Sequence, residues 1–451
     1  MTEKPQYEKA SLDWTLMITV TLLVIFGLVF VQSLSADASE KLIGHRFYYI
    51  HRQLLALALS LLCSQIIYRF WSINFIKKHA RLLLTISISL LIFTQTPVTS
   101  YTISGAGRWI NFGFLAVFAL PLSTLLLVLF LAAYLSNNFS NNNLISKASM
   151  WLLITALVFS FLLLSQPDVI GLLIIGCVML SISLAAQKYK FALLLTLVGV
   201  FFGTFILFDS PYRTLRVLTF LQPFDHMFSE GYQLSISLMA IAGGDFFGTG
   251  FENGVLNRAK FPGAFDNFAF ASIAEEFGVF GILLICTGLA IILWRCLSLA
   301  FQLLANDRQT EGLIVIGFSS WLFFVSFFHM GINLGLLPTA GLPLAFISFA
   351  PFYQLSFILG TTIVLRIGQQ QGLQKDSTQM PRKVGFSVIT AFLLIITNTY
   401  FKAVSDKWLQ QQYTQRSQSL SRSQNSQLAN KNCLINPSQT SKKLSGEQNE
   451  Q

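Results

Sequence analysis

Charge is scarce in this sequence. Asp, Glu, Lys and Arg make up only 11% of its 451 residues, whereas 53% are hydrophobic and 43 are Phe. Soluble globular domains carry roughly a quarter charged residues, so this composition excludes a soluble protein and indicates an integral membrane protein. The net charge of +10 is typical of basic cytoplasmic loops under the positive-inside rule, and we expect no nucleic-acid partner.

Cysteine and histidine are also few, with five of each in the chain. No two cysteines form a CxxC pair, which argues against a disulfide framework. The scattered histidines argue against a metal enzyme, and we expect no metal site. The cysteines are Cys63, Cys177, Cys286, Cys296 and Cys433.

Long apolar runs dominate instead. A transmembrane helix needs about 20 mostly apolar residues, and the first run is too long, and its lead too acidic, for a signal peptide. The sequence predicts an all-α polytopic integral membrane protein of about ten transmembrane helices. The predicted spans are 16–34, 50–68, 82–98, 114–135, 149–165, 168–186, 191–208, 271–294, 312–334 and 342–365.

These spans divide the chain into segments. A further apolar run at 385–402 is either an extra transmembrane helix or an interfacial one. The tail 408–451 is rich in Gln, Ser and Asn with few aromatic residues, which predicts disorder. The remaining segments are a cytoplasmic N-terminus at 1–14, transmembrane helices 1–7 at 15–208, a large extracytoplasmic loop at 209–270 and transmembrane helices 8–10 at 271–367.

The basic loops orient the chain. With the N-terminus in the cytoplasm, most short loops rich in Lys and Arg fall on the cytoplasmic side. The large loop 209–270 then lies outside, on the same face as Gly105–Trp109 and Gln166–Asp168. We expect these three segments to build one site.

The densest polar chemistry lies in Gly231–Phe280, which reads GYQLSISLMAIAGGDFFGTGFENGVLNRAKFPGAFDNFAFASIAEEFGVF and leads into an apolar run. A polar, Gly-rich segment at the mouth of a membrane helix is where a site is expected. This segment resembles the signature core of the SEDS family (shape, elongation, division and sporulation), whose members include FtsW and RodA. The matching residues are Gly231-Tyr232-Gln233, Ser237-Leu238, Ala240, Gly244, Gly248, Gly250, Pro262, Ala264, Phe268, Phe270-Ala271, Glu275-Glu276 and Gly278.

Three further motifs carry the resemblance: Gly105–Trp109, Gln166–Asp168 and Gly331–Ser348. Arg108 of the first motif is a candidate for binding substrate, and the other two motifs are assigned to the architecture of the fold. An Asp in the first turn of a helix is stabilised by exposed amides, and Gly and Pro in membrane helices permit close packing or a break. The segment Gly231–Leu234 resembles FtsW more than RodA. The structural-motif residues are Trp109, Gln166, Pro167, Asp168, Gly231, Gln233, Gly248, Gly250, Pro338, Gly341, Pro343 and Ser348.

The resemblance implies a SEDS-like bundle and an activity. Such proteins polymerise lipid II, a disaccharide-peptide on a polyprenyl pyrophosphate, at the outer face of the bacterial cytoplasmic membrane. The family's T-D-F motif carries an Asp that takes a proton from an acceptor sugar hydroxyl. Here that Asp position holds Asn267, and Asp266 stands one residue earlier. The catalytic candidates are therefore Asn267, which holds the family's position, and Asp266. Of the two, only Asp266 can act as the base, since an amide cannot accept a proton as a carboxylate does.

Charged residues near the outer face are candidates for holding the substrate. Arginine matches phosphate oxygens with two donors, although arginines at a membrane interface also serve as anchors. Adjacent carboxylates at a helix start have a structural explanation as well. The substrate-binding candidates are Arg108, Arg213, Arg216, Glu275 and Glu276.

Three functions remain open on the sequence. The first is an FtsW-like peptidoglycan glycosyltransferase that works during cell division with Asp266 in a rearranged pocket. The second is a catalytically degenerate scaffold of the division or envelope machinery, and the third is a lipid or solute transporter. The resemblance implies a class B penicillin-binding transpeptidase and other division proteins as partners. No cofactor is expected, apart from a divalent cation that could accompany the substrate's pyrophosphate.

Overall fold

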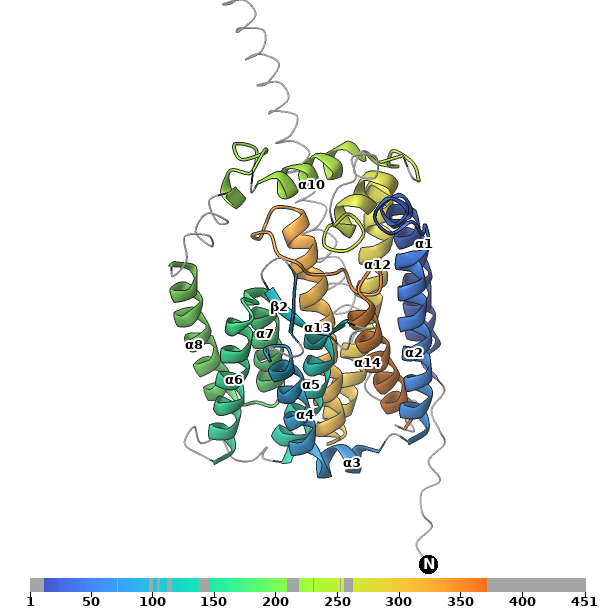
Figure 1. The fold of residues 1–451 in the computed structure, drawn as a ribbon. Coiled ribbons are helices and arrows are strands. Elements are labelled where there is room, and N and C mark those ends of the chain that lie inside the picture. The colour runs from blue at the N-terminus through green and yellow to red at the C-terminus, as the bar shows by residue number, and fades with distance from the viewer. Residues whose placement is uncertain are drawn as a thin grey trace, which may run out of the picture. The chain divides into compact units, whose positions relative to one another are not determined.

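The computed structural model describes residues 12–70, 72–96, 100–103, 106–111, 116–137, 147–208, 219–229, 231–251, 253–254 and 263–370. These residues are mainly helical, and helices cross the molecule side by side (Figure 1). The predicted fold class, a polytopic helical membrane protein, is confirmed. The run 385–402 and the tail 408–451 lie outside the described residues.

Each of the ten predicted spans overlaps a helix of the described structure. By length and composition, α1, α2, α5, α12 and α13 are long and apolar enough to cross a membrane. Two shorter helices, α3 (Ile73–Lys78) and α10 (Tyr232–Gly243), lie between spans. The long helices are α1 (Trp14–Ile43), α2 (Tyr48–Phe70), α4 (Ala80–Phe93), α5 (Ala119–Asn137), α6 (Lys147–Ser165), α7 (Val169–Ala185), α8 (Tyr189–Phe208), α12 (Ala269–Ala305), α13 (Gln309–Asn333) and α14 (Pro351–Gln369).

Two predicted span boundaries are wrong. Within the span 114–135 the described residues start with a β-strand at Ala116, and helix α5 starts only at Ala119. The span 342–365 begins with non-helical chain, and α14 starts at Pro351. Proline fits the first turn of a helix but disfavours helix in the residue before it, so Pro343 and Pro351 delay this helix although the segment is apolar.

A small antiparallel sheet, which the sequence analysis missed, lies between α4 and α5. Its strands are β1 (Ser100–Ile103), β2 (Ala106–Asn111) and β3 (Ala116–Phe118), in the order β1-β2-β3. Trp109 pairs with Phe118 across the second ladder, and their ring centroids are 5.1 Å apart. β1 and β3 have only 4 and 3 residues, fewer than most strands in soluble sheets, so they are too short for periodicity to reveal them.

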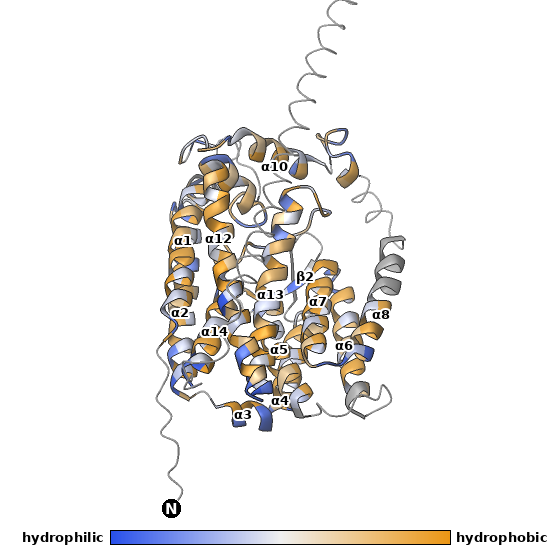
Figure 2. Cartoon of the chain, turned by 180° about the vertical axis from the view of Figure 1, so that it is seen from behind, coloured by the Kyte–Doolittle hydropathy of each residue, from blue (hydrophilic) through white to orange (hydrophobic). Residues whose placement is uncertain are grey.

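The helices pack closely where glycine removes a side chain. A Cβ on Gly360 of α14 would stand 2.2 Å from the Phe318 ring of α13, and one on Gly27 of α1 would stand 2.6 Å from the Phe346 carbonyl. Such contacts let backbones approach within a membrane bundle. Helices α1 and α12 consist mainly of hydrophobic residues (Figure 2), and the side chain of Leu62 on α2 is 65% exposed. Exposed apolar surface of this kind suits contact with lipid.

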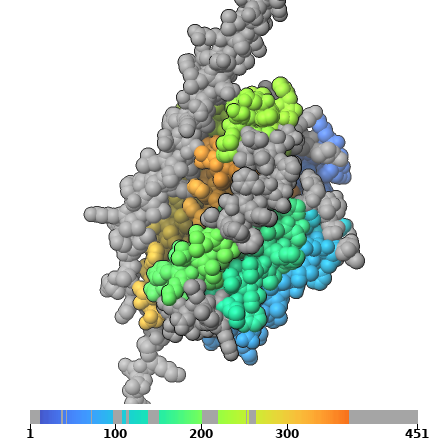
Figure 3. Space-filling view, turned by 90° about the vertical axis from the view of Figure 1, so that its left-hand side faces the viewer, coloured from blue at the N-terminus to red at the C-terminus, as the bar shows by residue number. Residues whose placement is uncertain are grey.

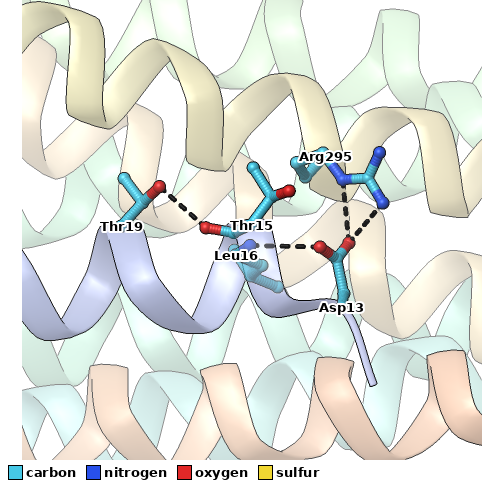
Figure 4. Close-up of polar contacts among 5 residues, drawn as sticks. All are labelled: Asp13, Thr15, Leu16, Thr19 and Arg295. Atoms are coloured by element: carbon cyan, nitrogen blue, oxygen red, sulfur yellow. Dashed lines mark hydrogen bonds and ion pairs between the residues drawn. The ribbon is translucent and has the colours of Figure 1, made fainter. Parts of the chain in front are cut away.

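The two ends of the bundle differ. Helix α3, with Lys77 and Lys78, lies at one end of the bundle, whereas α10 lies across the opposite end (Figure 1). At the first end the Asp13 carboxylate accepts from Arg295 of α12, with 2.7 Å between Oδ2 and Nη2 (Figure 4). In the space-filling view the yellow-green residues near 219–250 lie at the top of the molecule, beside orange residues from the last described part of the chain (Figure 3). The candidate site is at this second end.

Candidate functional site

Asp266 and Asn267 lie in a tight turn immediately before α12. The amides of Asp266 and Phe268 both donate to the carbonyl of Gly263, at 3.2 and 2.8 Å. The Asp266 carboxylate in turn accepts a hydrogen bond from the amide of Asn267. Gly263 has a φ of +90°, which glycine adopts without the strain of a side chain. The turn therefore holds a half-buried acid at the N-terminal end of α12.

The pKa of the Asp266 carboxyl is raised above its ordinary value. Burial is the main cause, because desolvation disfavours the charged form, while hydrogen bonds from the backbone of Asn267 and of Asp266 itself act the other way. A general base works best when its pKa approaches the operating pH. The environment of Asp266 thus moves its pKa in the direction that suits proton transfer.

Helix α13 caps the N-terminus of α12 from the side. The cap residue Phe268 supplies no side-chain acceptor. Instead, the amide of Phe270 donates to Nε2 of His329 at 3.3 Å, and the amide of Ala271 donates to Oδ1 of Asn333 at 3.1 Å. His329 and Asn333 are one helical turn apart and both are fully buried. The start of α12, and with it the acidic turn, is therefore fixed to α13.

Helix α12 breaks at Gly278, whose φ is 62° and ψ is −157°. The break leaves backbone groups of α12 without partners inside the helix. The glycine-rich segment that follows α10 supplies those partners. Thr249 and Gly250 donate their amides to the carbonyls of Glu275 and Glu276, at 2.9 and 3.1 Å. In the other direction, the amides of Val279 and Phe280 donate to the carbonyls of Asp245 and Phe246, at 3.1 and 3.2 Å. Unsatisfied backbone groups are costly in a membrane, so this exchange stabilises the break.

Glu275 and Glu276 lie just before this break, and both are buried. The carboxylate of Glu275 lies against Gly254 of the segment between α10 and α12, where an added Cβ would stand 2.7 Å from Oε2. The two predicted substrate-binding acids therefore face packed protein rather than open solvent. Whether they touch substrate stays a prediction.

Arg108 projects from β2 towards the loop between α6 and α7. Its guanidinium donates to the carbonyl of Pro167 at 2.9 Å and lies 3.6 Å from the Asp168 carboxylate. Asp168 is almost completely buried and caps α7 by accepting from the amide of Gly171 at 3.1 Å. Arg108 is still 23% exposed, so part of the guanidinium can meet a ligand.

Gln166 and Ser348 make hydrogen bonds to neighbouring segments of the chain. The side-chain amide of Gln166 donates to the carbonyl of Leu91 and to the hydroxyl of Thr94, at 3.2 and 2.8 Å. The hydroxyl of Ser348 accepts from the amide of Leu344 at 2.7 Å. Both residues are buried. Each therefore contributes to the scaffold around the outer end of the bundle.

The segment before α14 reaches the acidic turn. The amide of Phe349 donates to the carbonyl of Phe265 at 2.8 Å, and their rings lie 5.9 Å apart. The Tyr49 ring of α2 is 4.8 Å from Phe265 and 5.0 Å from Phe349. Gly341 faces the Asn267 side chain, with an added Cβ 3.4 Å from Oδ1. Three distant parts of the chain thus surround the turn.

A search of protein families matches residues 13–372 of this chain to the family described as cell cycle protein, which covers FtsW, RodA and SpoVE. The match spans most of the chain. The chain belongs to this family.

Similar proteins bear this out. A protein of Allochromatium vinosum named "Probable peptidoglycan glycosyltransferase FtsW" is 32% identical over 368 residues, which are 79% of this chain and 89% of the relative. A relative of the same name from Coxiella burnetii is 31% identical over 365 residues, 79% of this chain and 96% of the relative.

Solved structures share the fold of this family member. A chain from a structure described as "Structural coordination of polymerization and crosslinking by a peptidoglycan synthase complex" has a TM-score of 0.66 and 25% identity, with 81% of this chain and 99% of that chain covered. The rod shape determining protein RodA of Thermus thermophilus has a TM-score of 0.57 and 24% identity, over the same shares of the two chains.

The remaining predicted residues have varied positions. Gly231 is the residue just before α10, where an added Cβ would stand 2.5 Å from the carbonyl of Pro223, and Gln233 is exposed on the helix. Pro338 is half-buried in the segment before α14. Arg213 and Arg216 lie outside the described residues. Within the described ranges, no group of three or more His, Cys, Asp or Glu could hold a metal ion.

Sequence reasoning missed His329 and Asn333. Two polar side chains one helical turn apart, inside the apolar span 312–334, were the available signal. Polar residues within a membrane helix usually face the protein interior and make specific contacts. Which contacts they make could not be inferred, because their partners lie near the start of α12, far away in the sequence.

Proposed function

We propose that this family member is an FtsW-type peptidoglycan glycosyltransferase that polymerises lipid II at the outer face of the bacterial cytoplasmic membrane during cell division. Its membership of the family, and relatives whose names state this activity, support the proposal. The observation that carries it is the carboxylate of Asp266, held at the start of α12 with a raised pKa.

The proposed reaction assigns one step to Asp266. Its carboxylate takes the proton of an acceptor sugar hydroxyl as that oxygen forms a bond to the anomeric carbon of the donor sugar. The bond from that carbon to the pyrophosphate oxygen breaks, and the polyprenyl pyrophosphate leaves with the electron pair. General-base help of this kind contributes about 10²- to 10⁴-fold to rate. The substrate could bring a divalent cation with its pyrophosphate, and no resident cofactor is required.

We assign help to the leaving group to Arg108, which is the described member of the three predicted substrate-binding arginines. Its guanidinium keeps some exposure while it is oriented by Pro167 and Asp168. A held, partly exposed guanidinium stabilises developing negative charge better than a mobile one, because it needs no reorganisation during the reaction. Arg213 and Arg216, in the outer loop, complete the proposed set by the resemblance.

We further propose a class B penicillin-binding transpeptidase as partner. The solved structure with a TM-score of 0.66 is described as coordinating polymerization and crosslinking in one synthase complex, which supports a pairing of the two activities. Exposed apolar side chains on the transmembrane helices could pack against the single transmembrane helix of such a partner. The proposed location of the complex is the cytoplasmic membrane.

A second function is favoured by one residue. Asn267 stands where the family resemblance implies the catalytic Asp, and an amide does not act as a base. A chain that has lost its base would keep the fold and serve the division machinery as a scaffold. The chain is an enzyme if the carboxylate of Asp266 replaces the base that Asn267 cannot provide, and a scaffold if it does not.

The test is polymerisation of labelled lipid II by the purified chain together with its transpeptidase partner. We expect glycan strands from the wild type, a loss of about 10²- to 10⁴-fold in Asp266→Ala, and a smaller effect in Asn267→Ala. Binding of lipid II is measured on the same samples, so that loss of chemistry is separated from loss of binding.

Other outcomes would change the assignment. No polymer from the wild type, with polymer from Asn267→Asp, would identify a degenerate enzyme that acts as a scaffold. No polymer from either protein, and no binding of lipid II, would reject the glycosyltransferase and leave a scaffold or a transporter.

A further inference from the structure

The first backbone amides of α12 need hydrogen-bond acceptors that the neighbouring side chains do not supply. The first amides of a helix have no partner inside the helix, and a buried amide without a partner costs about 1–3 kcal/mol. Phe268, Ala269, Phe270 and Ala271 are all buried. Phe268, at the cap position, has no side-chain oxygen to offer. Acceptors must therefore come from another part of the chain.

His329 supplies the first acceptor in a defined tautomer. Its Nδ1 lies 2.6 Å from the carbonyl of Leu342, and since a carbonyl only accepts, Nδ1 carries the proton and donates. Nε2 is then an acceptor, as the amide of Phe270 requires. The ring thus links the start of α12 to the segment that precedes α14.

Asn333 supplies the second acceptor and uses its whole side chain. Oδ1 accepts from the amide of Ala271, and Nδ2 donates to the carbonyls of Asn267 at 3.1 Å and His329 at 2.8 Å. The two carbonyls require a donor and the amide requires an acceptor, so the orientation of the amide group is determined. Nδ2 is thus hydrogen-bonded to the acidic turn, while Oδ1 caps the helix that follows the turn.

From this geometry we propose that His329 and Asn333 are positioning residues, which set the place of the Asp266–Asn267 turn relative to the transmembrane bundle. The catalytic consequence rests on the proposed function, in which Asp266 is the base. The carbonyl of Asn267 is bonded to α13, so the backbone next to the acid cannot move without breaking this part-buried hydrogen bond. Helix α10 supports the arrangement, because the hydroxyl of Ser237 donates to the carbonyl of Asn333 at 2.9 Å.

The test compares replacements of Asn333 that differ in which bonds they keep. Asn333→Leu has nearly the same shape and loses all three hydrogen bonds. Asn333→Asp keeps the acceptor for Ala271, which preserves the cap, and retains a donor for at most one of the two carbonyls. Ser319→Ala is the matched control, since Ser319 is also buried in α13 but bonds only to the carbonyl of Ile316 in its own helix.

Hydrogen exchange of the full-length protein in detergent is measured first, because it does not depend on activity. The reporting amides are those of Asp266 and Phe268, which bond to Gly263 within the turn. We expect exchange to quicken by about tenfold in Asn333→Leu, by less in Asn333→Asp, and not at all in Ser319→Ala. Exchange in the second half of α12 should be unchanged in all three.

Lipid II polymerisation is the second measurement. Misplacing a catalytic group by about 1 Å costs about 10²-fold in rate, so Asn333→Leu should lower kcat by that order with little change in KM. A purely architectural role would reduce the folded fraction and leave kcat per folded molecule unchanged. In that case the positioning role is rejected.

The exchange experiment separates the two proposals. If the wild type makes no polymer but turn exchange still quickens in Asn333→Leu, the glycosyltransferase fails and the positioning role stands. Unchanged turn exchange in a folded Asn333→Leu rejects the positioning role, whatever the activity. If Asn333→Leu does not fold, Asn333→Asp and the pair His329→Gln and His329→Leu decide, because Gln can donate to Leu342 or accept from Phe270 while Leu can do neither.

Discussion

Gly248 of the outer loop lies against the carbonyl oxygen of Glu276 in α12, so closely that a Cβ at Gly248 would stand 2.1 Å from it. Gly248 also has a φ of +82°, a conformation that other residues rarely adopt. The backbones of the loop and of the broken helix therefore pack directly against each other. Gly248 of the predicted Gly-rich motif permits this packing because it has no side chain.

The first prediction follows from this contact. Gly248→Ala should reduce stability by about 3 kcal/mol, because the atom it meets is backbone and cannot swing away. Thermal unfolding in detergent measures the effect. Gly176→Ala is the control, since nothing lies within 4 Å of its Cβ position in α7, and alanine there should be neutral or stabilising. Equal unfolding temperatures for the two variants would contradict the packing.

The second prediction concerns Asp13, which accepts from the amide of Leu16 at 3.1 Å and pairs with Arg295 (Figure 4). Asp13→Ala loses both the cap and the ion pair and should cost about 1–2 kcal/mol. Asp13→Asn keeps the cap acceptor and should cost about 0.5 kcal/mol. A double-mutant cycle with Arg295→Met isolates the pair, and strict additivity would show that the pair contributes nothing.

The third prediction uses the raised pKa of Asp266. Activity should fall as pH drops through that pKa, which lies above the ordinary value of about 3.9, because the base becomes protonated. Polymerisation rates over a pH series give the acid limb. A limb at or below pH 4 would contradict the effect of burial, and a limb that persists in Asp266→Asn would show that another group titrates.

The raised pKa of Asp266 also makes the free energy of unfolding depend on pH. The folded protein binds the Asp266 proton more tightly than the unfolded chain, so this contribution to stability is fully present below about pH 3.9 and is lost as pH rises through the folded pKa. Asp266→Asn has no such dependence. The wild type should therefore lose stability relative to Asp266→Asn across this window, which unfolding temperatures at several pH values would measure.

The fourth prediction separates two roles of Arg108. Arg108→Gln leaves the buried Asp168 carboxylate without its cation and should cost about 1–3 kcal/mol. Adding Asp168→Asn removes that charge, keeps an acceptor for the amide of Gly171, and should restore most of the stability. If Arg108 also contacts the pyrophosphate, the KM for lipid II stays raised in the double variant. A KM that recovers together with stability would assign Arg108 to the architecture alone.

Several site features could be predicted from short sequence patterns, because their physics is local. Asp168 caps the helix that it precedes, and capping depends on residues within one turn. The glycines of the outer loop were also recognised as a motif. Their partners in α12 were not, since a glycine in a sequence does not say which backbone it will approach.

The amino-acid order alone was enough to establish that this protein spans a membrane and where most of its helices run, because about 20 apolar residues suffice for a helix in lipid whatever surrounds it. The family motifs added its kinship. Three features came only from the folded chain: the break of α12 at Gly278, the sheet around Trp109 and the capping of Phe270 and Ala271 by His329 and Asn333. The break and the capping satisfy backbone groups with partners that are distant in the chain, and the sheet pairs neighbouring short strands; such pairings follow from packing in three dimensions.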